Sequence, residues 1–436
     1  MRDYKFGTFL YNLRKEMGIS QSELGKLVGV SNKAVSKWET GESKPALKQL
    51  YKLSKIFDVT METLLDSISN DNKEVHKIVI TGGPCAGKST AFSWIQAEYS
   101  KQGYCVVFIP ESATEIILAG LSNKKMSNID FQLAITRNQI LKEKLFEDAI
   151  LKNTESDKIL IVCDRGVLDG KAYCNGMEFK QILRILGKNE VELRDSYDAV
   201  FHLVTAAKGN GANYTLETNK ARFETADEAV DADNRVMQAW AGHPHLRVID
   251  NNPSFEEKMK NLIKEISAFI GAQGPYEIEK KFLIEMPNLK KIKQYASKKV
   301  EIIQTYLSDP NGDEVRIRQR GEGNHFVYTL TKKKKVSDGE RIETEKRISK
   351  EEYLSLLINA DIERGQIRKT RHCFVYNNQY FELDIYPFWS DRAILEIELN
   401  AKEDQYELPD FIKVIEEVTN NEKYSNYSLA KLVKIK

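Results

Sequence analysis

The sequence has no long hydrophobic run, few cysteines and almost no net charge. No stretch approaches the roughly 20 apolar residues that a helix needs to cross a bilayer, and Met1 to Phe9 contain no apolar run, so we expect neither a membrane helix nor a secretory signal. The five cysteines are scattered and form no CxxC pair. This pattern predicts separate thiols in a reducing cytoplasm rather than a disulfide framework or a zinc site.

The charges of the chain nearly cancel. The 65 Lys and Arg residues and 64 Asp and Glu residues give a net charge of +1. Such a chain does not coat nucleic acid or membranes indiscriminately, so any nucleic-acid binding should be confined to one module. With 436 residues, 41% of them hydrophobic, the chain exceeds a single hydrophobic core, and several folded domains are expected.

Two polar, turn-rich stretches, at residues 66–74 and 271–275, divide the chain. The first part has helical periodicity, the second alternates apolar strands with helical stretches, and the third is mostly strand-like. We therefore predict a multidomain protein. Its parts are an all-α domain over residues 1–68, an α/β domain with a parallel sheet over residues 75–271, and an antiparallel β-barrel with flanking helices over residues 275–436.

The first part carries the pattern of a helix-turn-helix. Ser20 can cap one helix and Ser31 the next, and Gly29 ends the helix between them. The helix from Ser31 turns Val35 and Trp38 inward and places polar and basic side chains outside, as a recognition helix in a DNA major groove requires. The residues expected to contact DNA are Gln21, Ser31, Asn32, Lys33, Ser36 and Lys37. The apolar residues expected inside are Phe6, Leu10, Leu13, Leu24, Leu27, Val28, Leu47, Leu50, Leu53, Ile56 and Leu64.

The segment ISQSELGKLVGVSNKAVSKWETGESKP resembles the XRE, or lambda-repressor-like, helix-turn-helix family. The resemblance covers about residues 4–66. It implies binding to double-stranded DNA, with a homodimer reading two half-sites of a palindrome. A small helical bundle that binds only protein is the alternative.

The second part opens with a phosphate-binding loop. A strand over residues 77–81 leads directly into GGPCAGKST and then a helix, which is the pattern GxxxxGK[ST] in its proper context. Glycines let backbone N–H groups surround phosphate oxygens, and the helix dipole adds to this. Lys88 is expected to reach the β- and γ-phosphates and Ser89 to hold Mg²⁺. The residues expected to bind ATP or GTP are Gly82, Gly83, Gly87, Lys88, Ser89 and Thr90.

Charged residues follow the next two strands. The strand over residues 105–109 is followed by Glu111, and the strand over residues 159–163 by Asp164 and Arg165. Ligands bind at the carboxyl ends of parallel strands, so we predict that Asp164 holds Mg²⁺ through water. Glu111 can orient an acceptor or accept its proton, with a salt bridge to a local lysine as the alternative. Arg165 can contact a phosphate or pair with a neighbouring acid.

The stretch from Ala206 to Asn251, which follows a predicted strand at 199–205, resembles the AAA_28 branch of P-loop proteins. The resemblance implies that Arg222 is the lid arginine that closes on the transferring phosphates, a role suited to a permanent planar cation. Arg235 is a second candidate. Asn251 comes after a predicted strand at 246–249, where many P-loop kinases contact the base.

The third part places apolar side chains on one face of its strands and dense charge on the other. The charges recur at every second position in seven strands. A solvated face explains one or two such strands, but seven together predict that the sheet closes around its charges. Buried ions cost several kcal/mol each unless they are paired or bound to a ligand, so the lumen should be wet and hold metal and polyanion. Helical stretches at 350–358 and 410–419 are expected to cover part of the apolar face.

Residues 276–434 resemble the CYTH family of triphosphate tunnel metalloenzymes, whose signature ExExK stands here as Glu277-Ile-Glu279-Lys-Lys281. The resemblance implies that an inorganic or organic triphosphate is bound and hydrolysed with Mg²⁺ or Mn²⁺. The cations implied on its oxygens are Lys281, Arg316, Arg318, Lys333, Lys369 and Arg371. The implied metal ligands are Glu277, Glu279, Asp384, Glu396 and Glu398. The residues expected to act in catalysis are Glu277, Glu279, Lys281, Arg222 and Glu111.

The order of the last two parts resembles that of the TRPL translocation defect proteins, in which an AAA_28 domain is followed by a CYTH domain. This resemblance implies GTP and a membrane lipid as further ligands. Together these patterns predict a cytoplasmic, nucleotide-responsive DNA-binding regulator that binds ATP or GTP and binds or hydrolyses a triphosphate. Two alternatives stay open. One is a P-loop kinase fused to a tunnel triphosphatase, with the helix-turn-helix controlling its own expression, and the other is a sensor without turnover.

Overall fold

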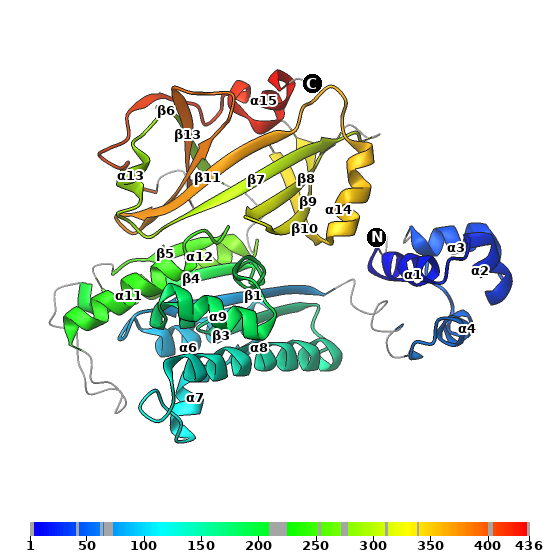
Figure 1. Cartoon of the computed structure of the whole chain (residues 1–436), viewed down its shortest axis with the longest axis horizontal. Coiled ribbons are helices and arrows are strands. Elements are labelled where there is room, and N and C mark those ends of the chain that lie inside the picture. The colour runs from blue at the N-terminus through cyan, green and yellow to red at the C-terminus, as the bar shows by residue number, and fades with distance from the viewer. Residues whose placement is uncertain are drawn as a thin grey trace. The chain divides into compact units, whose positions relative to one another are not determined.

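The computed structural model contains the predicted all-α part, parallel sheet and antiparallel sheet in chain order (Figure 1). No helix in the described ranges is long and apolar enough to cross a membrane. The structure describes residues 4–40, 43–61, 64, 73–208, 225–251, 254–271, 278–309, 313–337, 340–399 and 404–433.

The amino-terminal part is formed by short capped helices. Ser20 accepts the backbone N–H of Glu23 while the Glu23 side chain accepts the N–H of Ser20, which closes a capping box. Gly29 ends that helix at φ +84°, in the region that glycine favours, and Ser31 caps the next. The helices are α1 (Tyr4–Glu16), α2 (Gln21–Val28), α3 (Asn32–Glu39) and α4 (Leu47–Phe57).

The core of this part contains most of the predicted apolar residues, and Trp38 is buried in it as expected. Leu27 and Leu47 were predicted inside, but they are 54% and 67% exposed. In α2 the buried stripe runs through Leu24 and Val28, four residues apart, so Leu27 falls beside it. Leu47 is the first residue of α4 and precedes the turn that packs against the core.

The central part is a parallel sheet in the order β2-β3-β1-β4-β5. Four of the five strands include or match the predicted strands, and the fourth in the chain ends at Leu203 rather than residue 205. The strands are β1 (Glu74–Gly82), β2 (Cys105–Ile109), β3 (Lys158–Asp164), β4 (Ala199–Leu203) and β5 (Leu246–Ile249). The helical segments are α6 (Lys88–Lys101), α7 (Ser112–Leu118), α8 (Asn128–Asn153), η1 (Val167–Tyr173), α9 (Gly176–Leu186), α10 (Glu190–Arg194), η2 (Ala206–Lys208), α11 (Ala226–Trp240) and α12 (Phe255–Phe269).

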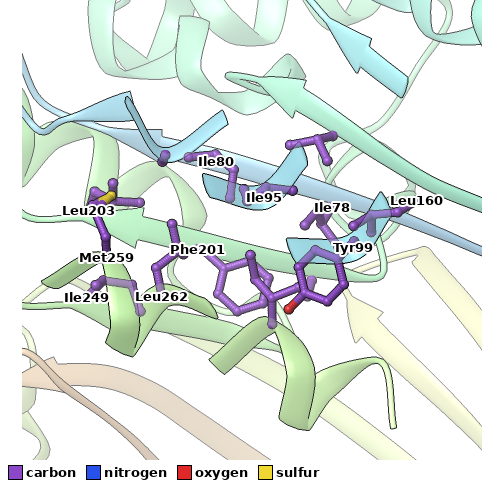
Figure 2. Packing of buried hydrophobic residues seen from close by; sticks show 14 of the residues in the cluster. Ile78, Ile80, Ile95, Tyr99, Leu160, Phe201, Leu203, Ile249, Met259 and Leu262 are labelled. Carbon is purple, nitrogen blue, oxygen red and sulfur yellow. The ribbon is translucent and has the colours of Figure 1, made fainter. Parts of the chain in front are cut away.

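Helices α6 and α12 pack against this sheet through one hydrophobic cluster (Figure 2). The Tyr99 hydroxyl of α6 bonds to Ser267 Oγ at 2.8 Å and donates to the Ile263 carbonyl of α12 at 3.1 Å. Each fully buried aliphatic or aromatic side chain contributes about 1.5–3 kcal/mol. The packing therefore fixes the start of α6, and with it the P-loop, on the sheet. The labelled side chains are Ile78, Ile80, Ile95, Tyr99, Leu160, Phe201, Leu203, Ile249, Met259 and Leu262.

The carboxy-terminal part is a nine-stranded antiparallel sheet in the order β10-β9-β8-β7-β11-β12-β13-β6-β14. The strands are β6 (Ile278–Glu285), β7 (Ser297–Leu307), β8 (Glu314–Glu322), β9 (His325–Ser337), β10 (Glu340–Ile348), β11 (Ile367–Tyr376), β12 (Gln379–Ile385), β13 (Arg392–Leu399) and β14 (Val414–Glu417). The helical segments are α13 (Leu289–Ile292), α14 (Lys350–Leu356), η5 (Leu357–Asn359), η6 (Glu422–Tyr424) and α15 (Asn426–Leu432).

The predicted helix at 410–419 is wrong, because this stretch contains β14, which pairs with β6. The edge of β6 offers backbone hydrogen bonds, and the neighbouring branched residues Val414 and Ile415 suit a strand. The predicted helix at 350–358 forms α14 followed by a 3₁₀ turn. In the described part of the chain, β10 and β14 are the two edges of the sheet.

The sheet curls around its charged face. His245, just before β5, is buried, which lowers its pKa, while the negative charges of Glu398 on β13 and Glu345 on β10 oppose that shift. These two strands stand far apart in the sheet order, so both can act on one side chain only if the sheet bends round (Figure 1). The concave face is the charged one.

Apolar clusters bound the charged band on the concave face. At one end Leu283, Ile367 and Ile394 pack with Leu429 and Ala430 of α15. At the other end lie Val300, Ile302 and Cys373. The convex face packs a separate apolar cluster that includes Ile292 of α13. The charged side chains therefore occupy a limited middle section of the curled sheet.

Candidate functional site

The P-loop lies between β1 and α6, as its sequence predicts. Gly82 takes φ +140° and Gly87 φ +92°, and a Cβ at Gly82 would lie 2.1 Å from the Leu203 carbonyl oxygen. Lys88 begins α6 with 8% exposure. Ser89 and Thr90, in the first turn of the helix, are exposed. The helix start therefore presents a hydroxyl pair to solvent and a lysine within the loop.

Asp164 and Lys88 lie near enough for the charge of each to act on the pKa of the other. Burial raises the pKa of Asp164 to about 6, although the charge of Lys88 opposes the shift. Burial and the charge of Arg165 lower the pKa of Lys88 to about 8, with Asp164 acting in the opposite sense. Oδ1 of Asp164 is buried without a hydrogen-bond partner. An unpartnered carboxylate oxygen at this place fits a magnesium-bound water.

Glu111 pairs with Arg165 rather than with a local lysine, which is the pairing with a neighbouring acid that the sequence left open for Arg165. Its Oε1 lies 2.5 Å from Arg165 Nε, and Arg165 also donates to Asp169 at 3.0 Å and to the Gly82 carbonyl at 3.2 Å. Burial favours the neutral acid, but the charges of Arg165 and Lys88 outweigh it and lower the pKa of Glu111 to about 2. Such a carboxylate becomes an effective base only after Arg165 is drawn away.

Sequence reasoning missed Asp233 of α11, which is fully buried behind the P-loop. Its Oδ1 accepts the N–H of Gly83 at 2.8 Å and that of Thr205 at 3.2 Å, and lies 3.0 Å from His202 Nε2. Its other oxygen lies 2.8 Å from Lys208 Nζ. The carboxylate thus joins the loop, the end of β4 and α11, and no motif in the sequence marks it.

The other residues that the sequence predicted to contact the nucleotide are already engaged within the protein or lie outside the described residues. The Asn251 amide donates to the Thr205 carbonyl at 2.7 Å and accepts from Lys258 Nζ at 2.9 Å, so both its groups are engaged within the protein. Arg235 donates to the Ala172 carbonyl in η1. Arg222 lies outside the described residues.

The concave face of the antiparallel sheet brings predicted cations and carboxylates into one network. Arg371 donates to both oxygens of Asp384 at 2.7 Å, to Glu396 at 2.7 Å, and also to Glu382. Lys369 bonds to the same Asp384. Burial opposes ionisation of Asp384, but these two cations hold its pKa below the usual value. Glu382 is a member that the sequence did not assign to the site.

Lys281 extends the network onto β6. Its Nζ lies 3.0 Å from Glu396 and 3.1 Å from Glu279. The strand register places Glu396 opposite Lys281 and Glu398 opposite Glu279. The two described members of the ExExK pattern therefore meet the carboxylates of β13, while Glu277 lies outside the described residues.

The other half of the concave face is richer in cations. Arg316 and Arg318 of β8 lie on this face opposite Tyr306 and Gln304 of β7. Lys333 of β9 follows on the same face. Arg318 Nη1 lies 3.6 Å from a Glu345 oxygen on β10. Arg316, Arg318 and Lys333 thus form one side of the concave face, called the cationic wall below, and the carboxylates of β12 and β13 form the other side.

In the helix-turn-helix part, Asn32, Lys33 and Lys37 are exposed on α3, whereas Ser36 is half-buried. The Ser31 hydroxyl accepts the Ala34 N–H as a helix cap. Gln21 donates to Glu39 at 2.9 Å. Glu39 also forms a buried ion pair with Arg14, at 2.5 and 2.8 Å, which the sequence did not reveal.

Three family models match the chain in succession. A helix-turn-helix model (HTH_3) matches residues 10–64, an AAA domain model (AAA_28) residues 77–258, and a CYTH domain model residues 275–431. The chain joins an XRE-like helix-turn-helix, an AAA_28 domain and a CYTH domain. The three resemblances stated from the sequence are thereby confirmed.

Individual relatives match single domains. Repressor protein C2 of Salmonella phage P22 is 36% identical over 85 residues, which are 19% of this chain and 38% of the repressor. The HTH-type transcriptional activator BcrR of Enterococcus faecalis is 38% identical over 61 residues, which are 14% of this chain and 30% of that protein. The chain therefore spans well under half of either curated relative.

Two solved structures are similar to parts of the chain. The crystal structure of the P22 c2 repressor with a synthetic operator is 40% identical, covering 14% of this chain and 94% of that one, with a TM-score of 0.14. The crystal structure of the inorganic triphosphatase NE1496 is 26% identical, covering 37% of this chain and 97% of that one, with a TM-score of 0.27.

The CYTH carboxylates meet the chemical requirement for a divalent cation, because oxygen donors crowd together there. Burial raises the pKa of Glu382, and the neighbouring charges of Glu398 and Glu396 add to that shift while Arg371 opposes it. Such mutual repulsion favours a bound cation. Among the described residues, however, no group of three or more His, Cys, Asp or Glu side chains is already arranged to hold a metal. The predicted metal site requires Lys281, Lys369 or Arg371 to release carboxylates.

Proposed function

We propose that the protein is a nucleotide-responsive, DNA-binding regulator whose CYTH domain binds and hydrolyses a triphosphate with a divalent metal. The observation that carries this proposal is the concave face on which Arg371 and Lys369 bond to carboxylates beside the cationic wall of Arg316 and Arg318. A polyanion alone would need only cations, so interspersed carboxylates favour the entry of metal with the triphosphate.

In the proposed reaction the cationic wall takes the phosphate oxygens first. Arg316, Arg318 and Lys333 bind the triphosphate, and Lys369 and Arg371 exchange Asp384 for phosphate oxygens, which suit their charge and geometry. Lys281 likewise exchanges Glu279 and Glu396 for phosphate oxygens, so that these two carboxylates would hold Mg²⁺ or Mn²⁺. The metal would polarise a phosphoryl group toward attack by water. These residues therefore orient the chain of phosphates and neutralise its charge.

In the AAA_28 domain we propose that ATP or GTP binds at the P-loop. Lys88 contacts the β- and γ-phosphates, Ser89 ligates Mg²⁺, and Asp164 holds it through water. The buried Asp164 oxygen without a hydrogen-bond partner and the exposed Ser89 support this assignment. Arg222 would close over the phosphates.

The amino-terminal domain supplies the regulatory output. We propose that a homodimer binds a palindrome in double-stranded DNA, in the cytoplasm, with Asn32, Lys33 and Ser36 facing base edges and Lys37 a phosphate. The exposure of Asn32, Lys33 and Lys37 along α3 supports this orientation.

The experiment measures binding of the full chain to DNA from upstream of its own gene, alone and with ATP, GTP or tripolyphosphate in Mg²⁺ buffer. A regulator changes its affinity for this DNA with at least one ligand, and does not do so in the Lys88→Ala and Arg316→Ala double variant. If DNA affinity is the same under every condition, the regulatory proposal fails.

A second candidate is a P-loop kinase joined to the triphosphatase. The buried Glu111–Arg165 pair at the end of β2 favours it, because an acceptor that draws Arg165 away would leave Glu111 as a base. A kinase would transfer a labelled γ-phosphate to a small acceptor, and the Glu111→Gln variant would lose this transfer. A regulator without kinase activity would show no transfer in either protein.

A further inference from the structure

An arginine of the AAA_28 domain reaches the carboxylates of the CYTH domain. Arg247 of β5 forms an ion pair with Glu398 of β13. Its guanidinium also lies 3.7 Å from Glu265 of α12 and donates to the Leu246 carbonyl. Glu398 is one of the carboxylates assigned to the metal, so this contact joins the nucleotide domain to the tunnel chemistry.

A polar network holds β5 against the CYTH sheet. Arg320 of β8 lies 2.9 Å from Asp195 and also donates to the Gly242 carbonyl. Gln238 exchanges two hydrogen bonds with the backbone of Ser297, at 2.9 and 3.0 Å. Because these contacts surround the turn that leads into β5, the backbone of β5 is held at the sheet, and the Arg247 side chain can reach the charged face from it.

A pocket lies beside the ion pair of Arg247 and Glu398. This pocket of about 720 Å³ is lined by Arg247 together with Glu279, Glu382, Glu396 and Glu398. Its volume suits a small ligand, and it opens the carboxylate end of the concave face toward β5 and α12. A metal-bound triphosphate in this pocket would lie against Arg247.

The number of carboxylates near Glu398 explains why a positively charged side chain lies beside it. Five carboxylates lie on the concave face: Glu279, Glu382, Asp384, Glu396 and Glu398. Among the described residues of the CYTH domain, the cations that pair with members of this group are Lys281, Lys369 and Arg371. Glu398 lies at the end of this row, opposite Glu279. Arg247 supplies a fourth positive charge at this end of the row.

We propose that Arg247 is a binding residue of the CYTH site, supplied by the AAA_28 domain. Without ligand it holds Glu398 and competes with the divalent cation for that carboxylate. With triphosphate and a divalent cation bound, Glu398 would be a ligand of the cation, and the planar guanidinium of Arg247 would turn to the outermost phosphate, with which it can form two parallel hydrogen bonds. This inference rests on the proposed triphosphate function and adds to it a residue from the neighbouring domain.

The proposal predicts opposite effects of one substitution on two ligands. Arg247→Met removes the competitor for Glu398, so Mn²⁺ alone binds about threefold to tenfold more tightly, whereas tripolyphosphate with Mg²⁺ binds about tenfold more weakly through loss of a charge-assisted pair. A residue with a purely structural role would not move the two affinities in opposite directions.

The measurement uses the full chain carrying Lys88→Ala, which silences the P-loop, with Mn²⁺ affinity from electron paramagnetic resonance and tripolyphosphate affinity from calorimetry. Lys264→Met is the matched control, because Lys264 also lines the pocket but pairs with Asp404. It should leave both affinities unchanged. Arg247→Lys keeps the charge without the fork, so it should retain wild-type Mn²⁺ affinity and lose part of the triphosphate affinity; it also serves if the Met variant does not fold.

The outcomes separate the two claims. If the parent protein binds no tripolyphosphate, the proposed function of the CYTH domain fails. If the parent binds it and Arg247→Met leaves both affinities unchanged, or weakens both, Arg247 is only an interdomain contact and the inference is overturned.

Discussion

The Asp195 carboxylate of the AAA_28 domain lies 2.9 Å from the Arg320 guanidinium of the CYTH domain. Asp195 also pairs with Arg194 at 2.6 Å, and its backbone carbonyl accepts from Arg347 of β10. Burial favours the neutral acid, but the charges of Arg194 and Arg320 lower the pKa of Asp195 to about 2. The two domains therefore share a buried, ionised carboxylate.

We predict that Asp195→Asn destabilises the protein by about 3 kcal/mol, because it leaves buried arginine charge without its partner. The folded pKa is below the unfolded value of 3.8, so the stabilisation is fully present above that value and is lost as the pH falls toward about 2. Chemical denaturation from pH 3 to 7 should show the difference between variant and wild type growing with pH. Asp391→Asn, in the exposed pair with Arg392, is the control. A difference independent of pH would show that the ion pair is not the cause.

The sequence predicted the features that local patterns determine. The P-loop needs its glycines and lysine in fixed order between a strand and a helix, and the charged face needs only alternation with period two. Contacts between distant segments leave no such pattern. Asp195, Asp233 and Arg247 stand among ordinary charged residues, and only the folded chain brings Asp233 to Gly83 or Arg247 to Glu398.

The errors have the same origin. Residues 410–419 read as helical locally, but β6 has an edge that pairs with Val414 to Glu417. Arg320, to which no role was assigned from the sequence, shows the same limit of a local pattern: it continues the alternation of Arg316 and Arg318, but it lies at the end of the charged band and pairs with Asp195. Periodicity identifies the face of a strand and gives no information on what covers each end of it.

For the nucleotide domain we predict that Lys88→Ala lowers Mg²⁺·ATP and Mg²⁺·GTP affinity at least tenfold, because the phosphate site loses a charge-assisted hydrogen bond worth about 1.5–3 kcal/mol. Isothermal titration of the full chain measures it. Lys101→Ala, at the exposed end of the same helix, should bind like the wild type. If Lys88→Ala binds Mg²⁺·ATP and Mg²⁺·GTP as tightly as the wild type, the P-loop is not the nucleotide site.

For the recognition helix we predict that Lys33→Ala and Ser36→Ala weaken binding to DNA from upstream of the gene more than binding to random DNA, since base contacts are worth about 1–3 kcal/mol of discrimination. Lys15→Ala, on an exposed lysine of α1, should lower both affinities alike or neither. Competition binding at fixed salt gives the ratio. Equal losses on both DNAs would make α3 a backbone contact only.

The central claim is that the CYTH domain hydrolyses a triphosphate with metal, and phosphate release by the full chain tests it most directly. Purified protein carrying Lys88→Ala is incubated with tripolyphosphate or a nucleoside triphosphate, with Mg²⁺, Mn²⁺ or chelator. We predict metal-dependent release that falls at least about 100-fold in Glu396→Gln, which keeps the shape of a metal ligand and removes its charge. Arg316→Ala should mainly raise KM. Tight triphosphate binding without metal-dependent release from any triphosphate tried would contradict the claim and leave a sensor without turnover.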